Sequence, residues 1–273
     1  MGASRQKAES SRQKEGAHSH AGDLQMGKVL SIDLAYRRVR DLGICLIEEH
    51  RGRPTTARFV DPKGDLGFKR PPSAQELAET ISNYCHENEI RVLLLDGPQG
   101  WKDPSSNLKE CRYCERILNT PGKTGVRPQT KPKNWRDFAE YSVSLFDSMV
   151  RAGGELVRTP VISFAGERLL VIESFPAGAW QMLRMSPLRA EWRKKPAALK
   201  GRLKTLQRLY GFRCEGCLTH DGLQALVAGL AGVAILAGNA ARYITLGVPP
   251  NRDNGVTVEG FIVCPRRVIR RQK

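Results

Sequence analysis

A hairpin followed by a separate buried strand is the feature of this sequence that most constrains its fold. Apolar runs at 29–35 and 42–47 flank a basic link at 36–40, which predicts antiparallel strands at about 28–36 and 40–49. A third short run at 55–60 extends them into an antiparallel meander. After an intervening helix, 91–96 is apolar without alternation, as in a strand covered on both faces. This order predicts an α/β fold, with a mixed sheet and helices on its faces.

Further helices and strands follow from periodicity and from capping signals. Ser73 and Glu76 have the spacing of a capping box at the start of a helix, and Asn134 predicts the start of another. A strand is expected at 169–173, and Pro176 indicates a helix start. An Ala- and Gly-rich helix is expected at about 220–241, where small residues allow close packing on a sheet, and a final strand at 256–263.

Composition divides the chain into a tail, a domain and a second tail. Residues 1–26 are polar without apolar periodicity and are expected to form a disordered N-terminal tail. Residues 27–265 are predicted to form the α/β domain, and 266–273 a basic C-terminal tail. Within the domain, the Pro-, Gly- and Lys-rich segment 100–133 reads as a long irregular insertion after the fourth strand, and 184–213 as a basic helical stretch.

The charge of the chain favours a polyanionic partner. With 44 Lys and Arg against 28 Asp and Glu, the formal net charge is +16, which points to nucleic acid. A solvated basic surface, or an affinity for acidic proteins, remains an alternative. No run of about eighteen apolar residues and no apolar signal-peptide core is present, so we expect no membrane partner and a cytoplasmic location. The start 1–6 resembles a myristoylation site, but Gln6 stands where Ser or Thr is required.

Four acidic residues lie in or beside apolar elements, where a solvated carboxylate is not expected. A charge on a half-buried face costs several kcal/mol unless a partner offsets it. Two carboxylates about 4 Å apart repel by roughly 4 kcal/mol at an effective dielectric near 20, so a cluster stays ionised only with a cation. Hard oxygen ligands suit Mg²⁺ or Mn²⁺, and paired ions of this kind promote phosphodiester cleavage. The four candidate catalytic residues are Asp33, Asp96, Glu173 and Asp221.

Structural explanations compete for three of these acids. Asp96 precedes Gly-Pro and could belong to simple turn chemistry. Asp221 could cap a helix, although Thr219 is also available as a cap. Glu173 could pair with an arginine of the basic stretch. Asp33 has no such structural explanation.

The ordered motifs of the chain resemble a known protein family, domain of unknown function 429. The resemblance covers about 28–265 and rests on Asp33 in the first hairpin, Asp96-x-Pro98, Arg112 with Cys114-Glu115-Arg116, Glu173-Ser-Phe-Pro-Ala, Lys200-Gly-Arg, His220-Asp221 and Glu259-Gly-Phe-Ile. That family is regarded as predicted nucleases of RNase H-like fold, related to the resolvase RuvC. The resemblance therefore implies an RNase H-like domain with acids on the first strand, the fourth strand and a late helix.

One position departs from the family pattern. The family's late helix usually reads Asp-x-x-Asp, whereas this chain has Asp221-Gly-Leu-Gln224. The carbonyl oxygen of Gln224 can coordinate a cation or orient a water molecule, but it brings no charge, so weaker metal affinity is expected.

Two Cys-x-x-Cys pairs have the spacing of two halves of a zinc site. The four candidate ligands are Cys111, Cys114, Cys214 and Cys217, which could join the insertion to the late helix through a structural Zn²⁺. Unpaired thiols or a redox pair are the alternatives. Gly122-Lys123-Thr124 lacks the upstream glycine of a phosphate loop, and no glycine-rich turn follows Asp33, which argues against phosphotransfer.

Taken together, the sequence predicts a nuclease dependent on Mg²⁺ or Mn²⁺ that acts on DNA or RNA. Asp33, Asp96 and Asp221 are predicted to bind metal, and Glu173 to assist with a ligand or a water molecule. The predicted contacts to the phosphate backbone are Lys194, Lys195, Lys200, Arg202 and the C-terminal tail. The alternatives are a non-catalytic nucleic-acid-binding module of the same fold and a basic scaffold protein.

Overall fold

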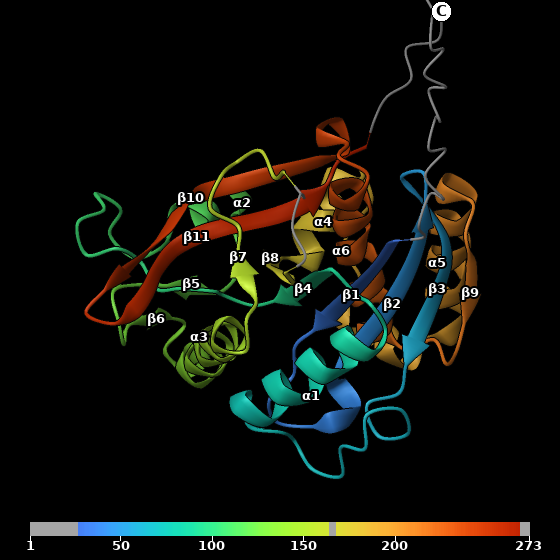
Figure 1. Ribbon diagram of the computed structural model, residues 1–273, viewed down its shortest axis with the longest axis horizontal. Coiled ribbons are helices and arrows are strands. Elements are labelled where there is room, and N and C mark those ends of the chain that lie inside the picture. The colour runs from blue at the N-terminus through green and yellow to red at the C-terminus, as the bar shows by residue number, and fades with distance from the viewer. Residues whose placement is uncertain (1–26, 164–167, 268–273) are drawn as a thin grey trace, which may run out of the picture.

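A computed structural model describes residues 27–163 and 168–267 of the chain, as a mixed sheet with helices on both faces (Figure 1). The predicted N-terminal tail and most of the predicted C-terminal tail lie outside these residues. The strands of the sheet are β1 (Gly27–Asp33), β2 (Gly43–His50), β3 (Arg53–Val60), β4 (Val92–Asp96), β7 (Glu155–Leu156), β8 (Leu170–Ser174), β9 (Arg213–Glu215), β10 (Tyr243–Asp253) and β11 (Val256–Pro265).

Strand order places the parallel strands at the centre of the sheet. The order is β10-β11-β8-β4-β1-β2-β3-β9, with β7 beside β8. β1, β2 and β3 pair antiparallel in sequence order, whereas β4 runs parallel to β1 and β8 runs parallel to β4. The carboxyl ends of β1, β4 and β8 therefore lie at the same end of the sheet, the usual place for a ligand site in an open α/β sheet. This arrangement confirms the predicted mixed sheet with flanking helices.

Helices cover both faces of the sheet (Figure 1). α1 (Ala74–Glu87) and α3 (Arg136–Arg151) pack together over one face, where the core includes Leu30, Leu93 and Phe146. The remaining helices are α2 (Tyr113–Leu118), α4 (Pro176–Met182), α5 (Pro196–Tyr210) and α6 (His220–Leu236). None of the described helices is long and apolar enough to cross a membrane.

α6 packs closely on the opposite face because its small residues meet the strands. A Cβ atom on Gly229 would lie 2.6 Å from Ile47, and one on Gly232 would lie 2.6 Å from Val29. Even a methyl side chain at either glycine would push the helix away from the sheet. The predicted close packing of the Gly-rich helix is therefore confirmed. The helix ends at Leu236, earlier than the expected 241.

Short irregular elements account for most differences from the expected boundaries. Ser73 caps α1 through the predicted capping box, but Asn134 lies in the 3-10 turn η2 (Lys133–Trp135) rather than at a helix cap. The basic stretch divides into the 3-10 turn η3 (Ala190–Lys194), α5 and the edge strand β9. The insertion contains α2 and a small pair of strands, β5 (Lys123–Thr124) and β6 (Thr130–Lys131). Two further 3-10 turns lie elsewhere: η1 (Val39–Asp41) in the β1–β2 link, and η4 (Ala240–Arg242) before β10.

Gly43 fixes the distance between β2 and the first turn of α6. A Cβ atom at this position would lie 2.1 Å from the backbone carbon of Asp221 and 2.6 Å from the backbone nitrogen of Gly222. Because backbone atoms cannot rotate away, we expect Gly43→Ala to displace the start of α6 and lower the free energy of unfolding by about 1–3 kcal/mol. Denaturant unfolding measures the loss.

Gly201 provides the matched control for this substitution. It lies within α5, and a Cβ atom there would have no neighbour within 4 Å. Gly201→Ala should therefore stabilise the protein by roughly 0.5–1 kcal/mol through helix propensity. Equal effects of the two substitutions would contradict the close approach at Gly43.

Candidate active site

Three of the four predicted acids converge at the carboxyl ends of the central strands. Asp33 ends β1 and Asp96 ends β4, and each continues a row of side chains that faces α6. Asp221 stands in the first turn of α6, which Gly43 allows to approach β2 opposite Asp33. The side-chain hydroxyl of Thr219 caps this helix by accepting a hydrogen bond from the Gly222 nitrogen at 2.9 Å, so Asp221 is not needed as a cap.

The electrostatics of the site show that these carboxyl groups repel one another. Burial raises the pKa of Asp33 well above its ordinary value, and the neighbouring Asp96 and Asp221 raise it further. Burial likewise raises the pKa of Asp96 to about 7, while a hydrogen bond from the Asp33 carboxyl opposes this rise. The two groups thus share a proton at the end of the sheet, because two carboxylate charges this close oppose full ionisation. We refer to Asp33, Asp96 and Asp221 as the acid cluster.

Arg193 supplies one positive charge to the acid cluster. Its two terminal nitrogens each lie 2.7 Å from an oxygen of Asp221, and one of them lies 3.4 Å from Asp41. The Nδ1 atom of His220 lies 2.9 Å from the Asp221 carboxylate. Asp221 is therefore the acid that pairs with an arginine of the basic stretch, a partner that the sequence suggested for Glu173.

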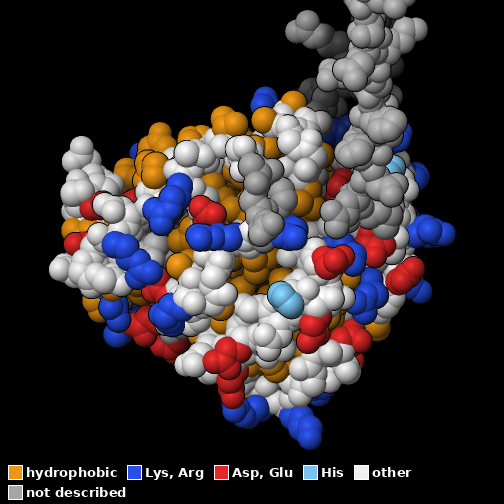
Figure 2. Space-filling model, in the orientation of Figure 1, with side chains coloured by type: hydrophobic (Ala, Val, Ile, Leu, Met, Phe, Trp, Pro, Cys, Tyr) orange, Lys and Arg blue, Asp and Glu red, His pale blue; other side chains and the backbone are white. Residues whose placement is uncertain are grey.

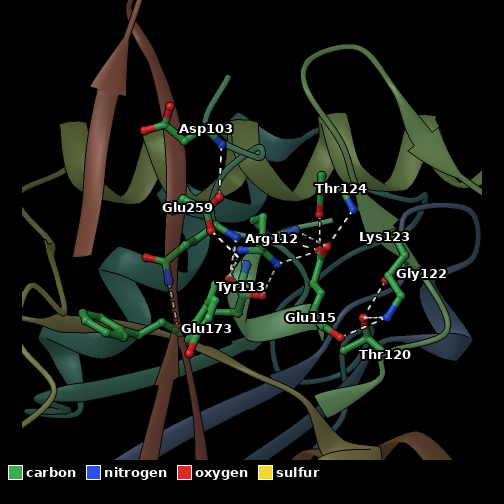
Figure 3. Close-up of polar contacts among 12 residues, drawn as sticks. Asp103, Arg112, Tyr113, Glu115, Thr120, Gly122, Lys123, Thr124, Glu173 and Glu259 are labelled. Carbon is green, nitrogen blue, oxygen red and sulfur yellow. Dashed lines mark hydrogen bonds and ion pairs between the residues drawn. The ribbon is translucent and has the colours of Figure 1, made fainter. Parts of the chain in front are cut away.

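Glu173 is held by a different arginine, in a buried network (Figure 3) whose Glu173 charge also raises the pKa of Asp96. Arg112 donates to both Glu173 oxygens at 2.7 and 2.6 Å, and the backbone nitrogen of Gln99 donates to one of them at 2.9 Å. Burial raises the pKa of Glu173, and Arg112 opposes the rise. Both of its oxygens are thus satisfied within the protein.

The same network ties the insertion to the sheet. Arg112 also donates to Glu115, which in turn accepts hydrogen bonds from the backbone nitrogen and the hydroxyl of Thr124. Glu259 in β11 accepts from the backbone nitrogens of Tyr113 and Asp103 (Figure 3). These contacts show a structural function for Arg112, Glu115 and Glu259, which the sequence singled out only as parts of a motif.

The donor chemistry of the acid cluster fits Mg²⁺ or Mn²⁺. Its three carboxylates are the hard oxygen donors that such cations prefer. Among the residues at 27–163 and 168–267, however, no group of three or more His, Cys, Asp or Glu side chains is already arranged around a metal position. A cation bound here would have to replace the Asp33–Asp96 hydrogen bond and the Arg193–Asp221 ion pair.

The side chain of Gln224 is engaged by a contact within the protein. Its carbonyl oxygen, the atom expected to coordinate a cation, accepts a hydrogen bond from the indole nitrogen of Trp180 at 2.7 Å. The expectation that Gln224 contributes a ligand is therefore not supported by its contacts.

The predicted zinc site is wrong in its geometry. Cys111 lies just before α2 and Cys114 lies within it, and this helix packs on β10 and β11. Cys214 lies on β9, at the opposite edge of the sheet. Four thiols at opposite edges cannot ligate one ion. Each is a free cysteine, and Cys114 is fully buried.

The predicted phosphate contacts divide into two kinds. Lys194, Lys195 and Lys200 are exposed in or beside η3 and α5. Arg202 instead packs its guanidinium against Trp192 and Trp180, 5.3 and 6.0 Å from the ring centres, and is half-buried. Lys and Arg side chains are spread over the face seen in Figure 2, with acidic side chains among them. Lys194 and Lys195 directly follow Arg193, the arginine that contacts Asp221.

A pocket beside the acid cluster was not predicted from the sequence. It has a volume of about 390 Å³ and is lined by Asp96, Glu173, Ser174 and several aromatic side chains.

Arg193 was missed in the sequence because nothing local distinguishes it from the nine other basic residues in its stretch. The aromatic residues were missed because they come from the β1–β2 link, η2, α3 and the segment after β8, and only the fold brings them together.

The raised pKa values predict that the acid cluster destabilises the fold as pH rises. The folded protein binds more protons than the unfolded chain between about pH 4 and about pH 7, so the free energy of unfolding falls through that window. Asp96→Asn should therefore be more stable than the wild type at pH 8, by on the order of 2 kcal/mol. At pH 4 the difference should shrink, which denaturant unfolding at both pH values measures.

Glu87→Gln, an exposed acid in α1, should show no such pH-dependent gain. If the free energy of unfolding changed with pH in the same way for the wild type and for Asp96→Asn, this would contradict a proton shared between Asp33 and Asp96.

Comparison with known proteins gives weak structural similarity. No protein-family model and no curated protein sequence matches the chain, so the resemblance to domain of unknown function 429 rests on the motifs and remains a prediction. Two solved structures of RuvC from Thermus thermophilus, one in complex with a Holliday junction substrate, align over 78% of this chain and 97% of theirs. Their sequence identities are 11% and 12%, with TM-scores of 0.36 and 0.37. At such TM-scores the similarity carries no argument about activity.

Proposed function

We propose that residues 27–265 form an RNase H-like domain that hydrolyses phosphodiester bonds of DNA or RNA with the help of divalent cations. The observation that carries this proposal is the convergence of Asp33, Asp96 and Asp221 from two strand ends and a helix start. Such mutual repulsion is costly for a fold and is typical of functional sites.

The acid cluster and the residues around it have distinct expected tasks. Asp33, Asp96 and Asp221 would hold Mg²⁺ or Mn²⁺, which when bound activates water and stabilises the leaving oxygen. Arg193 holds Asp221 in place until a cation or a phosphate competes for it. Lys194, Lys195 and Lys200 follow Arg193 closely and would bind the phosphate backbone without reading sequence. Glu173 has a positioning task, because Arg112 and Gln99 satisfy its carboxylate.

The second candidate is a nucleic-acid-binding module without catalysis. One observation favours it: the guanidinium of Arg193 makes two 2.7 Å contacts with Asp221 and already supplies a positive charge to this carboxylate. Gln224, whose oxygen is engaged by Trp180, adds no further ligand. Both candidates predict binding that weakens steeply with salt, so turnover separates them.

A cleavage assay with the full chain tests the proposal. Labelled single-stranded, duplex and branched DNA, RNA and RNA–DNA hybrid are incubated with Mg²⁺, with Mn²⁺ or with EDTA. Cleavage that needs the metal ion supports the nuclease. Binding without cleavage of any substrate would favour the binding module, and neither binding nor cleavage would refute both.

A further inference from the structure

The pocket beside Asp96 has aromatic walls contributed by three separate segments of the chain. We call it the aromatic pocket and define it by Tyr36, Trp135, Phe138 and Phe175, which line it together with Asp96. Its volume of about 390 Å³ falls within the range of small-ligand sites. Because Asp96 also belongs to the acid cluster, a ligand in this pocket would adjoin whatever the cluster holds.

Three of the four aromatic side chains, Tyr36, Trp135 and Phe138, form one packed group. The ring centre of Phe138 lies 6.0 Å from that of Tyr36 and 5.6 Å from that of Trp135. Gly122 lies flat against Trp135, since a Cβ atom there would come within 2.5 Å of the indole. All three rings nevertheless remain partly exposed. Rings held in this way, with free surface, provide a rigid platform for a flat aromatic ligand.

An unpaired polar atom belongs to one of the residues that line the aromatic pocket. Ser174 is 2% exposed, its hydroxyl has no hydrogen-bond partner, and it lines the pocket. A buried hydroxyl without a partner costs about 1–3 kcal/mol and is uncommon in folded proteins. The polar edge of a ligand would satisfy it. Arg112 and Glu173 also line the pocket, but both carboxylate oxygens of Glu173 already accept hydrogen bonds from Arg112.

A positive charge lies at the pocket as well. Arg37 lines it and lies over the ring of Tyr36, 5.0 Å from the centre. Arg37 and Asp137 form an ion pair of 3.9 Å in which both side chains are exposed, so the pair contributes little to stability. Arg37 can therefore turn to a phosphate group at small cost.

From these four observations we infer that the aromatic pocket binds an unpaired base of a polynucleotide strand whose neighbouring phosphate lies at the acid cluster. This inference rests on the proposed function only for the position of the phosphate. A flat ring, a polar edge and an attached anion are the properties of a nucleotide. Bases in a duplex are stacked and paired, so the occupant comes from a single strand, a loop or an extruded position.

Binding measured without turnover tests the inference. Fluorescence anisotropy in EDTA compares a labelled single-stranded oligonucleotide with the same strand carrying abasic sites, for the wild type and for Trp135→Leu. We expect Trp135→Leu to bind the intact strand about 10- to 100-fold more weakly, as loss of one stacked base would produce. We also expect abasic sites to weaken the wild type but to have little further effect on the variant. Tyr113→Leu, which removes an aromatic ring exposed on α2 outside the pocket, should bind as the wild type does.

Ser174→Ala provides a second variant that should fold normally, because removal of an unpaired hydroxyl is close to neutral. It should weaken binding of the intact strand and leave binding of the fully abasic strand unchanged. Equal binding of intact and abasic strands by the wild type would overturn the inference. So would binding of a free mononucleotide in the pocket without binding of the strand. Because no cleavage is needed, a failure of the proposed nuclease activity leaves this result unaffected, and cleavage that is insensitive to Trp135→Leu would refute the pocket alone.

Discussion

Asp33→Asn and Asp96→Asn should each abolish metal-dependent cleavage while leaving the protein folded. Either change removes a charged oxygen ligand from the acid cluster, and an amide cannot replace the charge that holds a divalent cation. Metal stabilisation of a transition state contributes several kcal/mol, so we expect a loss of about 10³-fold or more in the cleavage rate at saturating Mg²⁺. Single-turnover kinetics with the best substrate measure this loss directly.

The control for these variants is an acid away from the acid cluster. Glu87→Gln, at the exposed end of α1, removes the same charge and should keep the wild-type rate. Retention of cleavage activity in Asp33→Asn would show that the phosphodiester bond is cleaved at a site other than the acid cluster. A matching loss in Glu87→Gln would show that net charge, rather than the acid cluster, determines the rate.

Arg112→Met should cause the largest loss of stability of any single substitution considered for this protein. It leaves the carboxylates of Glu173 and Glu115 buried without their cation, in a region where Arg112 itself is 1% exposed. Breaking one partner of a buried ion network costs about 3–5 kcal/mol. Denaturant unfolding followed by tryptophan fluorescence should report this decrease at pH 8.

The pH dependence of this variant gives a second check. Without Arg112, the Glu173 pKa loses the main influence that lowers it, so the folded state binds a proton to higher pH than the unfolded chain does. The deficit relative to the wild type should therefore shrink as pH falls from 8 towards 5. Arg116→Met, an exposed arginine on the same helix, should change stability by less than about 0.5 kcal/mol. An equally small effect of Arg112→Met would contradict the role of the network.

The acids of the site could be predicted from the sequence because each breaks a local rule. Asp33 interrupts an apolar strand and Asp96 ends one, and a carboxylate in such a place has few structural explanations. Their proximity follows from the parallel pairing of β1 with β4, which the helix between these strands implies. The buried strand and the Gly-rich helix were likewise predictable, because packing on a sheet leaves periodic apolar and small residues.

Contacts between distant segments could not be predicted in this way. Arg112 and Glu173 are 61 residues apart, and nothing local indicates that one charge neutralises the other. Strand β10 was missed because Gly247, Pro249 and Pro250 are poor strand residues, and an edge strand with a register shift tolerates them. The Cys-x-x-Cys spacing misled for the same reason, since it is a local pattern and the strand order places the pairs at opposite edges.

The most direct test of the central claim is Mn²⁺ binding to the full chain, measured by electron paramagnetic resonance in the absence of substrate. The account predicts saturable binding that is lost in both Asp33→Asn and Asp96→Asn and retained in Glu87→Gln. Competition by Mg²⁺ should release the bound Mn²⁺. If the wild type binds no Mn²⁺, or if the two aspartate variants bind it as well as the wild type does, the acid cluster is not a metal centre and the nuclease proposal fails.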